Sequence, residues 1–294
     1  MKARFIINPV AGKKNRVRQV TDAVRDVFAS EDGIFEIKIA SRRGQAAELA
    51  KEAVEKGYEA VFACGGDGTM NEVASRLVGT NTALGIAPLG SGNGFAKALG
   101  IPDKLDAALA LLKTWKIRGI DAGKICGRYF FSTAGCGFDA HLSAKYNMGA
   151  LSRMVRGVLP YYPLALFEYM RYSPLQVTIQ SGNLSSCMTP LILTAANTGI
   201  YGGGAVIAPG AEPDDGLLDL CIVPYAGFAK TLRFGAHLLS GSILGADGFE
   251  TLRSDKFEIL RSGVSYVHAD GEPFEWGGSV SISVERRKLK VLAT

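Results

Sequence analysis

The stretch FACGGDGTMNEVA, residues 62–74, decides the fold. Residues 61–63 end an apolar run typical of a buried strand, and the Thr69–Glu72 spacing matches a capping box, which predicts a helix beginning at Thr69. The glycines at 65, 66 and 68 then lie in a strand-to-helix turn, where glycine permits positive φ and close approach of backbone N–H groups to a ligand. The positive end of the helix dipole beyond them suits a phosphate.

Asp67 is the unexpected residue of this turn, because a carboxylate repels a bare phosphate. It makes chemical sense if it meets phosphate through Mg²⁺, or if it accepts a proton or a hydroxyl hydrogen bond. The alternative is an ordinary turn in which Asp67 is merely exposed. The local pattern leaves both interpretations open.

Residues 1–118 repeat the order strand, turn, helix four times, which predicts an α/β domain with a parallel sheet. Ligands of such sheets gather at the carboxyl ends of the strands. No Walker A sequence and no G-x-G-x-x-G spacing occurs, so we do not expect a common P-loop or Rossmann site. The expected strand ends instead carry small, polar or basic residues: Asn8 and Gly12, Ser41 and Arg42, residues 66–69, and residues 90–93.

Residues 119–294 have a different texture, with short runs of period two separated by turns. This pattern predicts a second domain of mainly antiparallel strands in a sandwich or barrel. Helical inserts are expected at 151–172 and 227–249. The last strand is free to pack back on the first domain.

The composition of the chain limits the partners and the cellular compartment that we expect for the protein. The net charge of +5 comes without a long basic run, so nucleic acid is not an expected partner, whereas small anions or an anionic membrane are. Five cysteines without a C-x-x-C pair argue against a disulfide framework or a zinc cluster. With neither a signal peptide nor a spanning stretch, we expect a cytoplasmic protein. The aromatic, arginine-flanked insert at 151–172 predicts peripheral contact with the inner membrane face, or alternatively a helix pair packed on the sandwich.

Five motifs in this order carry a family resemblance. They are NPVAG (8–12), GGDGTMNE (65–72), PLGSGN (88–93), DDGLLDL (214–220) and DGEP (270–273). Together they resemble the diacylglycerol-kinase-like lipid kinases, which include the sphingosine kinases, over nearly the whole chain. GGDGT alone is also similar to a motif of the NAD kinases.

The resemblance implies a two-domain, Mg²⁺-dependent enzyme with ATP bound in the cleft between an α/β domain and a β-sandwich. The γ-phosphoryl group of ATP would pass to the hydroxyl of a lipid alcohol at the membrane surface. The nucleotide contacts that it implies are Asn8, Pro9, Val10, Ala11, Gly12, Ser41, Gly65, Gly66, Asp67, Gly68, Thr69, Met70, Asn71, Glu72 and Ser91.

The same resemblance implies a metal site and a catalytic base. Asp215, with backbone oxygens around Glu212 and Leu217, would hold Mg²⁺, and Glu272 would be the general base. Asp67 would organise the phosphates and the catalytic Mg²⁺, or would itself be the base. From local pattern alone, the Asp-Gly pairs at 215–216 and 270–271 are turns between strands.

The fourth turn departs from the bacterial diacylglycerol kinase pattern, which resembles G-T-x-N-D-F-A. Gly94 stands here in place of the acidic residue, and GSGN is similar to the sphingosine kinases, so diacylglycerol and a sphingoid base are both open as substrates. Two alternative functions are a soluble-substrate kinase of the NAD-kinase type and a non-catalytic nucleotide or membrane sensor. A homodimer is also open.

Overall fold

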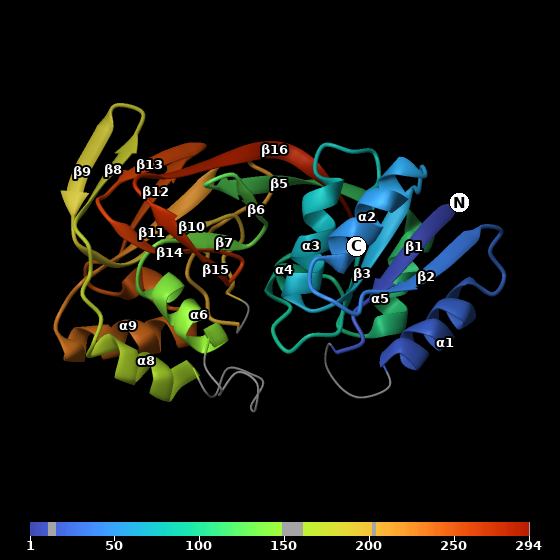
Figure 1. Cartoon of the computed structure of the whole chain (residues 1–294), viewed down its shortest axis with the longest axis horizontal. Coiled ribbons are helices and arrows are strands. Elements are labelled where there is room, and N and C mark those ends of the chain that lie inside the picture. Colours follow the sequence, from blue (N-terminus) through green and yellow to red (C-terminus); the bar gives the residue numbers. More distant parts are fainter. Residues whose placement is uncertain (11–15, 149–160, 202–203, 294) are drawn as a thin grey trace. The chain divides into compact units, whose positions relative to one another are not determined.

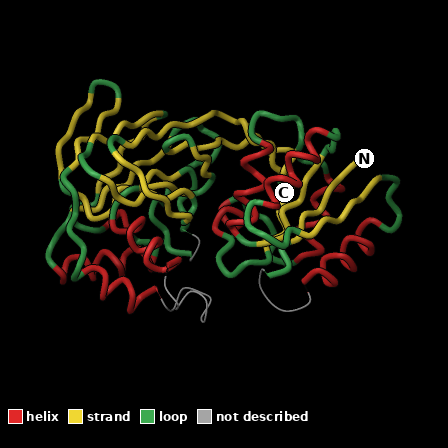
Figure 2. Tube along the Cα trace, viewed as in Figure 1, coloured by secondary structure: helices red, strands yellow, loops and turns green. Residues whose placement is uncertain are grey.

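The computed structural model describes residues 1–10, 16–148, 161–201 and 204–293 (Figure 1). The chain divides into two compact units, one of Met1–Ala122 with Arg286–Thr294 and one of Gly123–Glu285. Helices and strands alternate in the first unit, and strands predominate in the second (Figure 2). Strands β5 (Ile117–Ile125) and β16 (Val280–Leu292) each contribute residues to both units.

The first unit contains a parallel sheet in the order β2-β1-β3-β4, and the end of β16 pairs with β4. Strands β3 and β4 are buried along their whole length, as expected for a parallel sheet covered on both faces. Helix α2 packs with α3, and α1 packs with α5. The predicted α/β layer is confirmed. Its elements are β1 (Lys2–Ile7), α1 (Arg16–Phe28), β2 (Ile34–Ile39), α2 (Gln45–Glu55), β3 (Ala60–Gly65), α3 (Asp67–Leu77), β4 (Ala83–Pro88), α4 (Gly94–Ala98) and α5 (Leu105–Thr114).

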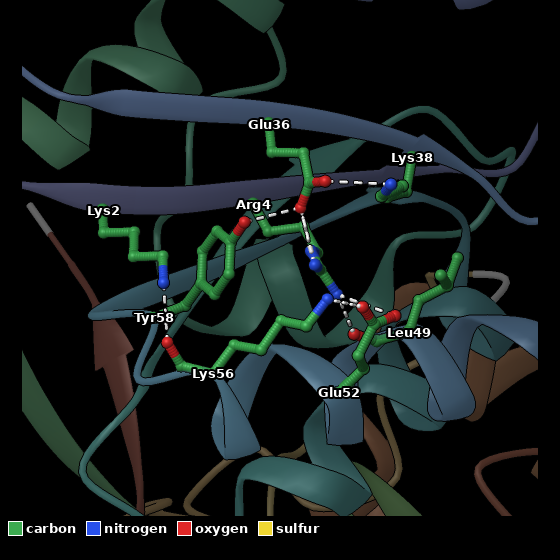
Figure 3. Close-up of polar contacts among 8 residues, drawn as sticks. All are labelled: Lys2, Arg4, Glu36, Lys38, Leu49, Glu52, Lys56 and Tyr58. Atoms are coloured by element: carbon green, nitrogen blue, oxygen red, sulfur yellow. Dashed lines mark hydrogen bonds and ion pairs between the residues drawn. The ribbon is translucent and has the colours of Figure 1, made fainter.

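A buried cation ties β1 to its neighbours in this unit (Figure 3). Arg4 is fully buried, its Nε donates to Glu36 Oε2 at 2.7 Å, and Nη1 donates to the Leu49 carbonyl at 2.9 Å. The Glu52 carboxylate lies 3.4 Å from Nη1, and the guanidinium lies 4.6 Å from the centre of the Tyr58 ring. Because a buried charge is costly unless it is paired, this cluster should tolerate little change.

The same cluster makes the free energy of unfolding depend on pH in the acidic range. Burial raises the pKa of Glu36, but hydrogen bonds from Tyr58, Lys38 and Arg4 outweigh it and lower the pKa from 4.5 to about 2. A carboxyl group with a lowered folded pKa stabilises the fold above its unfolded pKa, and that contribution is lost as the pH falls through the folded value. After allowance for partial exposure, we expect about 1–2 kcal/mol to be lost between about pH 5 and pH 2.

Urea unfolding of wild type, Glu36→Gln and the exposed control Glu55→Gln over this pH range measures the effect. The gap in unfolding free energy between wild type and Glu36→Gln should be widest near neutral pH and should shrink in acid. A gap that stays constant with pH would contradict the assignment.

The second unit is a β-sandwich. One sheet has the order β12-β11-β10-β7-β14-β15, and the other contains β13, β8, β9, the start of β16, β5 and β6. The pairs within it are antiparallel, as the period-two pattern predicts. The strands are β6 (Arg128–Phe130), β7 (Thr133–Gly135), β8 (Val177–Ser181), β9 (Leu184–Met188), β10 (Pro190–Ala196), β11 (Leu218–Pro224), β12 (Glu250–Ser254), β13 (Lys256–Leu260), β14 (Val264–Ala269) and β15 (Glu272–Gly277).

Strand β11 shows how the sandwich and its helices share one sheet. Leu220 and Ile222 face the core between the two sheets, whereas Cys221 and Val223 face a second core on the other side. Helix residues such as Phe138 and Phe234 fill that second core. The helices are α6 (Phe138–Met148), α8 (Tyr161–Tyr169), α9 (Phe228–Ser240) and the short η1 (Ile243–Gly245).

The predicted insert at 227–249 contains α9 and η1. Of the predicted insert at 151–172, residues 151–160 lie outside the described part of the chain, and the remainder contains α8. All five cysteines are free thiols, in agreement with the expected absence of a disulfide framework. In the described ranges, no helix combines the length and the apolarity needed to cross a bilayer.

Candidate functional site

The first two turns of α3 connect the four turns that follow β1, β2, β3 and β4. These strands are parallel, so their carboxyl ends lie at one edge of the sheet. Each of the other three turns donates a hydrogen bond to a side chain of residues 67–72. The GGDGTMNE motif is therefore the hub of this edge.

Asp67 ties the third turn to the fourth. Its Oδ2 accepts the N–H of Asn93 at 2.9 Å, and its Oδ1 accepts the N–H of Gly94 at 2.9 Å. Burial raises the pKa of Asp67, and these backbone donors lower it in part. The Asn93 side chain in turn bridges the N–H and the carbonyl of Gly90. The carboxylate in the glycine turn thus holds the backbone of its neighbour.

Thr69 and Glu72 make the other two connections. Asn8 Nδ2 donates to Thr69 Oγ1 at 3.0 Å, and the N–H of Gly44 donates to Glu72 Oε1 at 2.9 Å. The predicted capping box is wrong: α3 begins at Asp67, Gly66 is its N-cap, and no side chain caps it. The reason is that both side chains bond across turns instead of back to their own helix.

Close packing, rather than positive φ, requires glycine at positions 65 and 90. The structure places none of the glycines at 65, 66 and 68 at positive φ, and Gly66 has a φ of −97°. A Cβ on Gly90 would lie 2.6 Å from Gly66 Cα, and one on Gly65 would lie 2.5 Å from Thr69 Oγ1. Two glycine turns pack backbone against backbone here, which uses the small size of glycine and not the positive φ that it permits.

The other residues of the implied nucleotide site fall into three groups. Ser41, Ser91, Val10 and Gly68 are exposed at this edge, while Pro9 and Asn71 are half-buried. Met70 is 4% exposed and belongs to the core, so its side chain is not available to a ligand. Ala11 and Gly12 lie outside the described residues.

The implied metal loop of the second unit already contains a cation. Arg253 pairs with Asp215, and its Nε lies 3.2 Å from Asp219 Oδ1. Burial raises the pKa of Asp219, Arg253 lowers it, and the carboxylates of Asp215 and Glu212 raise it again. Two carboxylates, Asp215 and Asp219, pair with one guanidinium, which leaves a net negative charge that an additional hard cation could balance.

Backbone oxygens would have to complete such a site. Among the described residues, no three Asp, Glu, His or Cys side chains are placed to ligate one ion. Leu217 N–H donates to Asp215 Oδ1 at 2.8 Å, which brings the backbone of Leu217 next to that carboxylate. The donor chemistry of this loop therefore suits Mg²⁺ only if its carbonyls take part.

Glu272 begins β15 directly after a two-residue hairpin turn. Asp270 and Gly271 have φ of 49° and 80°, and Ala269 pairs with Glu272, which is the turn that an Asp-Gly pair predicts. Glu272 itself is exposed. The Asp270 carboxylate accepts three backbone N–H groups, those of Phe131, Ser132 and Thr133, at 2.8–3.1 Å. An ordinary hairpin turn is thus compatible with the implied role of Glu272 as a general base, because the turn holds the backbone next to Glu272 in place.

A buried pair behind this tip was not identified from the sequence. His268 Nε2 lies 3.0 Å from Asp139 Oδ2, and the Gly271 N–H donates to His268 Nδ1 at 3.3 Å. Thr194 donates its hydroxyl hydrogen to the same Asp139 oxygen. Because Nδ1 accepts, Nε2 carries the proton and donates it to Asp139.

The two units match two family models. Residues 2–125 match the diacylglycerol kinase catalytic domain, and residues 132–293 match the YegS C-terminal NAD kinase beta sandwich-like domain. The chain is 30% identical to the diacylglycerol kinase of Mycobacterium tuberculosis over 92% of this chain and 88% of that protein. It is 32% identical to a Pseudomonas putida protein whose name describes a YegS-like lipid kinase, over 94% of this chain and 90% of that protein.

Solved structures share the fold. A structure of a diacylglycerol kinase from Bacillus anthracis covers 100% of this chain and 97% of its own, with a TM-score of 0.74 at 17% identity. A second structure from that organism covers 100% of this chain and 95% of its own, with a TM-score of 0.83 at 20% identity. The fold is that of two-domain kinases, and the chain belongs to the family of diacylglycerol kinases and YegS-like lipid kinases.

Proposed function

We propose that the protein is an ATP- and Mg²⁺-dependent lipid kinase that transfers the γ-phosphoryl group of ATP to the hydroxyl of a lipid alcohol. The observation that carries this proposal is the α3 hub, in which Asp67, Thr69 and Glu72 fix three other turns at one edge of a parallel sheet. Such an edge is the usual ligand site of an open α/β sheet.

The phosphates are expected at the start of α3. No N-cap side chain stands at the start of this helix, where N–H groups without an intrahelical acceptor and the helix dipole favour an anion. Ser91, exposed on the fourth turn, adds a hydroxyl at the same edge. Fixed N–H donors can stabilise the charge of a transferring phosphoryl group without reorganisation.

Glu272 is the group that we assign as general base. Its side chain is exposed on a tip whose backbone is held through Asp270, so it can reach an acceptor hydroxyl and remove its proton as the new P–O bond forms. Asp67 is less suited, because both of its oxygens already accept backbone N–H groups. Asp67 then acts by positioning the fourth turn.

Mg²⁺ would neutralise charge on the phosphates when bound. On the second unit, Asp215 and the backbone oxygens of Glu212 and Leu217 would hold such an ion, with Arg253 and Asp219 beside them.

The acceptor is proposed to be diacylglycerol or a related lipid, including a sphingoid base. The backbone N–H of residue 94 donates to Asp67, so an acidic residue there would add a second carboxylate near Asp67, and Gly94 lacks that charge. This difference is why both lipid classes belong in the assay.

Transfer of radiolabelled phosphate from ATP to an extracted lipid pool tests the function. Labelled lipid that depends on Mg²⁺ supports the proposal, and its headgroup identifies the acceptor. Label on NAD instead would indicate a soluble-substrate kinase. ATP binding without transfer to either would indicate a sensor.

Nucleotide binding should depend on the packing of the two glycine turns. In Gly66→Val the new Cβ would lie 3.3 Å from Gly90 Cα and the rest of the side chain would point into this edge. We expect ATP affinity to fall by about tenfold or more while the fold survives. Calorimetry compares this variant with Gly245→Val, where the added Cβ meets open space. If the two folded variants bind ATP with equal affinity, the nucleotide does not bind at this edge of the sheet.

A further inference from the structure

Helix α9 has apolar side chains on two of its sides. Phe234 is 5% exposed and packs into the helix-covered core of the second unit, and Leu238 packs against the same core. Phe228, Leu232 and Leu239 are 49%, 64% and 53% exposed. Their spacing of four and seven residues puts them in one stripe. A surface helix normally turns a polar side to water, so this stripe needs an explanation.

Helix α8 lies against the start of α9 and carries exposed apolar side chains of its own. The Tyr169 hydroxyl donates to the Ala226 carbonyl at 2.6 Å, Thr231 donates to that hydroxyl at 3.0 Å, and the Tyr169 ring lies 6.0 Å from the Phe228 ring. The two helices therefore adjoin, as Figure 1 also shows. On α8 and just after it, Leu166, Phe167 and Met170 are 49%, 50% and 73% exposed. We call Leu166, Phe167, Met170, Phe228, Leu232 and Leu239 the apolar face.

The charges around this face have one dominant sign. Helix α9 contains no acidic residue and carries Lys230 and Arg233. The one acid of α8, Glu168, is buried and lies 2.8 Å from His141 Nε2. Arg171 follows α8, with its guanidinium 5.2 Å from the Phe167 ring.

An opposing carboxylate does reach one of these cations. Asp247 lies 2.8 Å from Lys230 Nζ. Arg171 and Arg233 still give the face a cationic border. Apolar side chains bordered by cations match the interface of an anionic bilayer, where the side chains enter the acyl boundary and the cations meet the headgroups.

We propose that the apolar face docks the second unit onto an anionic lipid bilayer, with α9 contributing as much contact as α8. This inference rests on the proposed function for its purpose, which is to bring the protein to a lipid acceptor. It extends the membrane contact expected at 151–172 to a second helix, 228–240, whose sequence was interpreted only as a helical insert.

Vesicle sedimentation of the full chain tests the proposal without turnover. The probes are phosphatidylcholine vesicles with and without about 30 mol % phosphatidylglycerol. Wild type should bind the anionic vesicles, and Leu232→Glu and Phe167→Glu should each lower the partition coefficient by about tenfold or more. The matched control is Leu184→Glu, which changes an exposed leucine of β9 in the same unit by the same charge. Added salt should weaken binding of wild type.

Three outcomes decide the matter once thermal melts show that the variants fold. Loss in Leu232→Glu with retention in Leu184→Glu supports the proposal. Equal binding by these two variants, or no binding by wild type, overturns it; in the second case, a wild-type dimer that Leu232→Glu dissociates would assign the face to a second copy of the chain.

A parallel assay on a short-chain, water-soluble lipid separates this inference from the proposed function. Turnover that survives in Leu232→Glu while vesicle binding is lost places the defect in docking. If the wild-type protein binds vesicles but phosphorylates no lipid, the proposed kinase activity is wrong and the docking surface stands.

Discussion

Glu272→Gln is expected to lower kcat by about 10²- to 10⁴-fold while leaving the affinity for Mg²⁺-ATP unchanged. The amide keeps the shape and much of the hydrogen bonding of the carboxylate but cannot accept a proton at neutral pH. Glu272 is exposed, so the substitution buries no new polar group and should leave the unfolding free energy within about 0.5 kcal/mol of wild type.

Glu275→Gln is the matched control for this prediction. Glu275 is an exposed acid of the same strand, opposite Tyr266 in the hairpin, and its loss should leave kcat near wild type. Calorimetry with ATP and initial rates on the accepted lipid give the two quantities. A Glu272→Gln enzyme with nearly wild-type kcat would exclude Glu272 as the base.

The strength of the expected effect depends on how firmly the hairpin tip is held. Asp270 accepts three N–H groups from residues 131–133, and Gly271 donates to His268, which is 2% exposed. A base on a fixed backbone has less conformational freedom to lose in the transition state. The buried Asp139–His268 pair therefore holds the hairpin turn that precedes Glu272, and this role needs no contact with a substrate.

The elements around the first-unit turns follow from local sequence, but the bonds between the turns do not. Alternating apolar runs and glycine turns predict the parallel sheet and the edge at which the turns meet. Thr69, Glu72 and Asp67, however, bond to partners 61, 28 and 26 residues away. A capping box is a short-range signature, and here Thr69 and Glu72 form hydrogen bonds with tertiary partners instead.

In the second unit too, the sequence did not reveal contacts between residues that lie far apart along the chain. His268 meets Asp139 across 129 residues, and Arg253 reaches Asp215 across 38. The DDGLLDL motif therefore indicates a loop rich in carboxylates but not the guanidinium that already occupies it. For α9, the helical period is visible in the sequence, but both sides are apolar, so only the packing of Phe234 shows which side is buried.

We expect Asp67→Asn to weaken the hydrogen bonds that hold the fourth turn, and to reduce turnover as a consequence of that change. An amide can accept only one of the two N–H groups of Asn93 and Gly94, and its own N–H₂ would face the other donor. Loss of a hydrogen bond to a charged acceptor costs about 1.5–3 kcal/mol, so ATP affinity should fall by about 10- to 100-fold if the fourth turn loosens. Asp103→Asn, an exposed acid of the same unit, should change neither stability nor affinity.

The two carboxylates can then be separated by what each variant loses. Thermal unfolding, calorimetry with ATP and kcat are measured for Asp67→Asn across a Mg²⁺ series. We expect a lower melting temperature, weaker nucleotide binding and reduced turnover together, because one side chain holds the turn on which all three depend. Suppose instead that Asp67→Asn binds Mg²⁺-ATP normally, melts like wild type and has no turnover, while Glu272→Gln remains active. The hydrogen bonds from Asn93 and Gly94 would then serve to orient a catalytic base, and the carboxylate in the glycine turn would be that base.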